Sequence, residues 1–100
     1  MKVKTINFST VYNQGLVKNI FKILKDPSYD SCSMLEISQA LGNEYKEGSV
    51  GWKNLRLHLI YLAQNGYIEE RHFGKIAADW EKRVDYVIEP KGMKESNALV

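Results

Sequence analysis

The chain has 100 residues, which is enough for one compact domain and too few for two. Hydrophobic residues make up 44% and charged residues 26%, a composition typical of a globular protein and unlike that of a disordered chain. Because the net charge is only +2, the chain would attract an anionic partner only where its cations lie close together.

The cysteine usage and the hydropathy of the chain bear on its compartment. The single cysteine, Cys32, cannot form a disulfide within the chain, which fits a reducing compartment. The first ten residues lack the apolar segment of a signal peptide, and no apolar run is long enough to cross a bilayer. We therefore expect a cytoplasmic protein with no membrane partner.

The N-terminal quarter predicts an arm followed by a first helix. Residues 1–11 alternate weakly and are expected to form a strand or an extended arm. Apolar residues then recur at helical spacing over residues 12–25, and Pro27 ends that helix. Three of its lysines share one face, which we expect to be solvated, with phosphate contact as the alternative. They are Lys18, Lys22 and Lys25.

A second, shorter helix is expected after a loop at residues 27–33. Ser33 and Glu36 match a capping box, in which the serine hydroxyl accepts from the Glu36 amide and the glutamate carboxylate accepts from the Ser33 amide. Gly42 is a natural end for this helix. A turn at residues 43–48 then leads to a third helix.

The third helix is expected to begin after Ser49, a good N-cap residue, and to end before Gly66. Leucines spaced by four and three residues give the helix one face that packs against a core. These leucines are Leu55, Leu59 and Leu62.

Two strands with alternating polarity follow, at residues 67–73 and 83–90. The loop that joins them is long for a hairpin. The tail, residues 92–100, is polar at first and is expected to be frayed. Three helices followed by a two-stranded antiparallel wing predict an α+β fold in one domain, residues 1–100, with its core at residues 12–91.

Three segments carry a resemblance to a known family. LEISQALG, LRLHLIYLAQNGYIEER and DYVIEPKGMK occur in this order within about residues 15 to 93. Together they resemble the winged helix-turn-helix domain of MarR- and PadR-type transcriptional regulators. The resemblance implies sequence-specific binding of double-stranded DNA by a transcription regulator, with the third helix in the major groove and the wing on the DNA backbone.

The residue types in the third helix and the wing suit this role. Arginine and lysine can bridge O6 and N7 of guanine, asparagine can bridge adenine, and both cations can hold phosphates. An ordinary solvated surface is the alternative interpretation. His58 belongs to the same half of the third helix. The candidate DNA-binding residues are Ser49, Trp52, Lys53, Asn54, Arg56, Leu57, Arg71, Lys75, Lys82 and Arg83.

Several apolar residues lie off the leucine face and form a candidate dimer or partner surface. They are Leu57, Ile60, Tyr61 and Trp80. These side chains could instead pack under the first helix or the N-terminal arm. We expect a homodimer on a pseudo-palindromic site, because a monomer would contact only a short stretch of DNA. The alternative function is a winged-helix protein interaction module that docks through this surface.

The sequence offers little for catalysis. His58 and His72 are isolated, and no cysteine or carboxylate lies at metal-ligand spacing from them. No glycine-rich phosphate loop or nucleophile motif is present. Cys32 precedes a helix N-terminus, which could lower its pKa, but a buried and inert thiol is the other interpretation. We therefore expect no enzymatic activity, no catalytic residue, no metal and no cofactor; the sequence does not identify a small-molecule effector.

Overall fold

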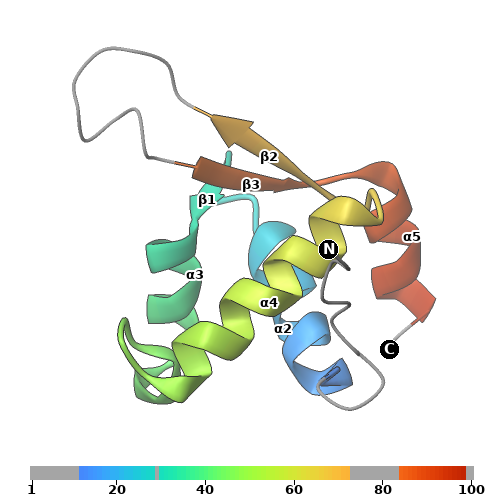
Figure 1. Ribbon diagram of the computed structural model, residues 1–100. Coiled ribbons are helices and arrows are strands. Elements are labelled where there is room, and N and C mark those ends of the chain that lie inside the picture. The colour runs from blue at the N-terminus through green and yellow to red at the C-terminus, as the bar shows by residue number, and fades with distance from the viewer. Residues whose placement is uncertain (1–11, 29, 73–83, 99–100) are drawn as a thin grey trace, which may run out of the picture.

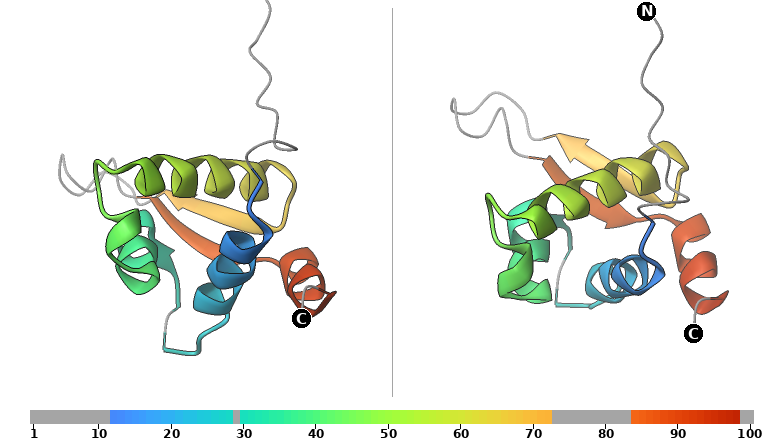
Figure 2. Two further views of the ribbon diagram at one scale, coloured as in Figure 1. Left: turned by 90° about the horizontal axis from the view of Figure 1, so that it is seen from below. Right: turned by 60° about the horizontal axis from the view of Figure 1, so that its bottom comes forward.

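The computed structural model describes residues 12–28, 30–72 and 84–98. These residues form helices and strands of an α+β fold, which confirms the expected class. In chain order the elements are α2 (Gln14–Leu24), β1 (Cys32–Ser33), α3 (Met34–Leu41), the 3-10 turn η1 (Asn43–Tyr45), α4 (Val50–Gln64), β2 (Ile68–His72), β3 (Val84–Ile88) and α5 (Pro90–Ala98). Figure 1 shows α2, α3 and α4 on one side of the sheet, and Figure 2 shows α5 beside α2.

The three expected helices are present, and side chains fix where each begins. Asn13 caps α2 by accepting a hydrogen bond from the Leu16 amide at 3.0 Å. The capping box of α3 is complete: the Ser33 amide donates to the Glu36 carboxylate at 2.8 Å, and the Glu36 amide donates to the Ser33 hydroxyl at 3.2 Å. The capping box of α3 uses side chains three positions apart, which is why the sequence alone predicts it, whereas the Asn13 cap is not predicted.

The sheet contains one strand that the sequence does not predict. The expected hairpin is present as β2 and β3, paired antiparallel with Glu70 opposite Tyr86. The end of the expected loop at residues 27–33, however, forms β1, which pairs with the other edge of β3 and places Cys32 opposite Tyr86. A two-residue strand is too short to show alternation, and only the distant β3 makes it a strand.

The expectation of a frayed tail is wrong for the residues that form α5. This helix starts with proline at its first position, where no amide hydrogen is required. Gly92 lets it pass close to the backbone just before β2, since a Cβ there would lie 2.1 Å from the Tyr67 carbonyl oxygen. Near its end, the Lys25 ammonium donates to the buried Ser96 hydroxyl at 3.1 Å. These long-range contacts hold a segment whose own sequence is polar.

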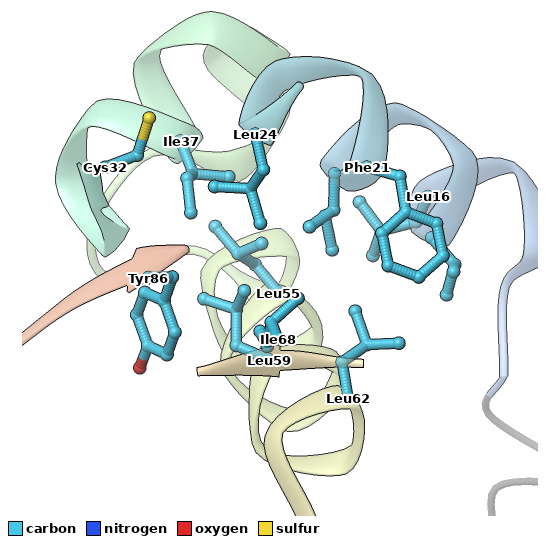
Figure 3. Packing of buried hydrophobic residues seen from close by; sticks show 12 residues of the cluster. Leu16, Phe21, Leu24, Cys32, Ile37, Leu55, Leu59, Leu62, Ile68 and Tyr86 are labelled. Carbon is cyan, nitrogen blue, oxygen red and sulfur yellow. The ribbon is translucent and has the colours of Figure 1, made fainter. Parts of the chain in front are cut away.

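The buried apolar side chains come from every layer of the fold and form one cluster (Figure 3). All three leucines of the predicted α4 face are buried, with exposed fractions of 1% or less. They pack among residues of α2, α3 and the sheet: Leu16, Val17, Ile20, Phe21, Leu24, Cys32, Ile37, Ile68 and Tyr86. No helix in the described part of the chain is long and apolar enough to span a membrane.

Candidate nucleic-acid interface

The turn before α4 is fastened to the first turn of that helix. The Ser49 hydroxyl accepts from the Trp52 amide at 3.0 Å and lies 2.6 Å from the Lys46 carbonyl oxygen. Gly51 brings η1 into backbone contact with α4, because a Cβ at this position would lie only 2.0 Å from the Glu44 carbonyl oxygen. The start of α4 is therefore held in place by a cap and by a glycine that leaves no space for a side chain.

His58 lies on the inner side of α4. The expectation that it is one of the polar residues available to DNA is wrong, because only 1% of His58 is exposed. Its Nε2 accepts from the Asn13 amide at 2.9 Å, and its Nδ1 lies 2.6 Å from the Asn54 carbonyl oxygen. The Asn13 backbone N–H can only donate and the Asn54 backbone carbonyl can only accept, so the imidazole proton of His58 is on Nδ1. His58 thus joins α4 to the start of α2.

The outer side of α4 carries the polar residues that were expected to contact bases. Lys53, Asn54 and Arg56 are exposed along the N-terminal half of the helix. Trp52 and Leu57 are half-buried, as is the capping residue Ser49. The structure therefore leaves a lysine, an asparagine and an arginine exposed within one turn of α4. Lys53 and Arg56 are neighbours on the helix surface, while Asn54 and Arg56, two residues apart, do not face each other.

The charge of Arg56 on α4 affects Tyr86 on β3. Burial raises the pKa of the Tyr86 hydroxyl, and the neighbouring Glu70 carboxylate raises it further, whereas the positive charge of Arg56 acts in the opposite direction. The guanidinium is therefore close enough to β2 and β3 to affect a side chain there. A cation in this position could contact a ligand that lies across both α4 and the sheet.

The cations on the hairpin are only partly described. Arg71 on β2 is exposed, and its Nε donates to the Glu69 carboxylate at 3.0 Å. Both side chains are about half exposed, at 57% and 48%, so water weakens this ion pair and it can be exchanged for a phosphate contact at little cost. The other expected wing residues, Lys75, Trp80, Lys82 and Arg83, lie outside the described residues.

Acidic residues limit the positive charge around the start of α4. The turn between α3 and α4 exposes Lys46 together with Glu44 and Glu47. Among the described residues of α4, the exposed cations are Lys53 and Arg56. An anionic ligand would therefore need to follow the helix closely to benefit from Lys53 and Arg56.

The apolar residues expected at a partner surface are partly covered by the chain itself. Tyr61 is half-buried, packs against the core cluster and meets the Tyr12 ring edge-on, with ring centroids 5.7 Å apart. Tyr12 also lies 6.0 Å from the His58 ring. Leu57 and Ile60 are half-buried as well. The surface available to a partner is thus smaller than the sequence suggests, and its described part is centred on Leu57 and Ile60.

Cys32 lies on β1, beside Tyr86 of β3, and is fully buried. Burial raises its pKa to about 11, and the neighbouring Glu36 carboxylate adds to the effect. The alternative in which the following helix lowers this pKa is therefore wrong, because the cost of burying a thiolate outweighs any benefit from the helix end. The thiol packs as a small apolar side chain.

Neither a cluster of metal-ligating side chains nor a similarity to known proteins identifies a function for the described residues. The described residues contain no group of three or more histidine, cysteine, aspartate or glutamate side chains that could hold a metal ion. Comparisons of the chain with family models, with curated proteins and with solved structures found no match.

Proposed function

We propose that the chain is a winged helix-turn-helix protein that binds double-stranded DNA sequence-specifically and regulates transcription. In this proposal the N-terminal half of α4 enters the major groove, and the β2–β3 hairpin follows the DNA backbone. The order of elements supports this arrangement, since α3, a turn and α4 precede an antiparallel hairpin. A helix fits the major groove, and a flanking hairpin can reach the adjacent phosphates.

The observation that carries the proposal is the division of α4 into two sides. Its leucine stripe is buried in the core, while Lys53, Asn54 and Arg56 are exposed near its start. These residue types can bridge guanine and adenine edges or hold phosphates. The N-cap and Gly51 fix the backbone beneath them, so little order must be gained on binding.

We also propose that the protein acts as a homodimer on a pseudo-palindromic site. One α4 can read only a short stretch of bases, and a two-fold dimer doubles that stretch. Leu57 and Ile60 are the described candidates for an isologous contact. Because these apolar side chains lie on the same helix as the cations, a protein docking module is the alternative. Sedimentation equilibrium at micromolar concentration, with Ile60→Asp as the disrupting variant, tests the dimer.

A matched pair of double variants tests the DNA interface. Lys53→Ala combined with Arg56→Ala removes two exposed cations from α4, and Lys18→Ala combined with Lys22→Ala removes two exposed cations from α2. Both changes lower the net charge equally, so general electrostatic attraction falls by a similar amount. The α4 double variant should bind duplex DNA about tenfold more weakly or worse, whereas the α2 variant should bind nearly as wild type.

The salt dependence of the same variants separates base from phosphate contacts. If both α4 cations hold phosphates, the slope of log affinity against log salt should become about 1.8 less steep. If they contact bases, the loss should instead be concentrated at particular sequence positions. Equal affinities of the two double variants for duplex DNA would remove α4 from the interface.

A further inference from the structure

Val50 is the most exposed large apolar side chain in the described part of the chain. Its exposed fraction is 74%, compared with 48% for Leu35 and 44% for Met93. It occupies the first position of α4, directly after the Ser49 cap. A valine contributes no hydrogen bond to a helix start and has a lower helix propensity than alanine. Neither core packing nor capping therefore explains why an apolar residue stands here.

The surroundings of Val50 hold it on the outer side of the helix. Its neighbour Gly51 takes the inner position against the Glu44 carbonyl, and the Ser49 hydroxyl closes the turn on the other side. The two methyl groups of Val50 are thus presented to solvent at the start of α4.

Val50 shares its side of α4 with the proposed base contacts. Lys53 and Asn54 follow it by three and four residues, which places all three side chains next to each other along the helix. Both of these polar residues are exposed. A ligand that lies against Lys53 and Asn54 would therefore cover Val50 as well.

We propose that Val50 recognises the C5 methyl group of a thymine in the major groove. This inference rests on the proposed DNA binding and adds a base preference to it. The thymine methyl is the apolar group that the bases present in the major groove, and the other groups there are hydrogen-bond donors and acceptors. Covering Val50 with a thymine methyl removes two apolar groups from water, whereas a cytosine in that place carries only a hydrogen on C5 and offers Val50 no methyl group.

The test replaces only the methyl group. Duplexes that bind the full-length protein are selected from a random pool, and each thymine of the enriched site is then replaced in turn by deoxyuridine, which lacks the C5 methyl. One such replacement should weaken wild-type binding about fourfold, as expected for one methyl group returned to water. Val50→Ser should bind the thymine and uracil duplexes equally.

Two further variants control for effects on folding and surface polarity. Val50→Thr keeps a methyl group in place and should retain the discrimination between thymine and uracil. Met93→Ser removes an exposed apolar side chain from α5 and should leave the discrimination unchanged. Equal wild-type affinity for thymine and uracil duplexes at every position would overturn the inference while leaving DNA binding intact. If no duplex is bound at all, the proposed function fails together with it.

Discussion

Gly51→Ala tests whether η1 and α4 make the backbone contact that positions the candidate interface. The added Cβ would lie 2.0 Å from the Glu44 carbonyl oxygen and 2.8 Å from its carbonyl carbon. Both atoms are backbone, so a side-chain rotation cannot relieve the clash and the turn must move by more than 1 Å to reach ordinary contact at 3.4 Å. Overpacking of this severity costs about 3 kcal/mol, and the better helix propensity of alanine returns about 1 kcal/mol. We therefore expect a net loss of about 2 kcal/mol.

Gly15→Ala is the matched control, because Gly15 occupies the same second position in α2. A Cβ there would meet only the Asn13 side-chain oxygen, at 3.3 Å, which can shift slightly. This variant should be within about 1 kcal/mol of wild type, with the helix propensity of alanine favouring stabilisation. Urea unfolding followed by circular dichroism gives both values from the midpoint. A Gly51→Ala protein as stable as wild type would refute the close contact between η1 and α4.

Other predictions address the core, the bridge between helices and the buried thiol. Leu59→Ala should cost about 2–5 kcal/mol in urea unfolding, because Leu59 is fully buried; a neutral effect would mean that the opposite face of α4 is inside. His58→Ala should cost about 1–3 kcal/mol or more, since it leaves the Asn13 amide without its ring acceptor; thermal unfolding of the two proteins gives the difference. Because the pKa of Cys32 is raised from 9.0 to about 11, the unfolded chain loses its thiol proton first as pH rises. The free energy of unfolding should thus fall between pH 9 and 11, by up to about 1.4 kcal/mol per pH unit, and Cys32→Ala should remove this part of the slope.

The elements that the sequence predicts well are those that neighbouring residues determine. The capping box at Ser33 and Glu36, the cap at Ser49 and the leucine stripe of α4 all involve residues within a few positions of one another. Hydrogen-bonding type and helical spacing are sufficient to identify them. The hairpin is also predicted, because β2 and β3 are long enough to show alternation.

The features that the sequence does not predict depend on contacts between distant residues. β1 is a strand only because β3 pairs with it, and α5 forms where Gly92 and Ser96 meet residues far away in the chain. In the sequence, His58 cannot be distinguished from the other polar residues of the third helix. Only the structure shows that its Nε2 accepts a hydrogen bond from the Asn13 backbone N–H.

For the candidate interface, the sequence identifies the exposed Lys53, Asn54 and Arg56 but does not single out Val50. The available signal is an apolar residue directly after an N-cap and outside the leucine stripe. That signal has little force until the exposed fraction is known, because isolated apolar residues are common on protein surfaces.

The salt dependence of wild-type binding to a random duplex shows whether α4 and the hairpin hold DNA phosphates. Each phosphate that a cation contacts contributes about 0.9 to the slope of log affinity against log salt. If three or more of the candidate cations on α4 and the hairpin hold phosphates, the slope should be about −3 or steeper. Absence of measurable binding at low salt, or an affinity that does not change with salt, would rule out DNA binding through these cations and favour a protein-docking role for the outer side of α4.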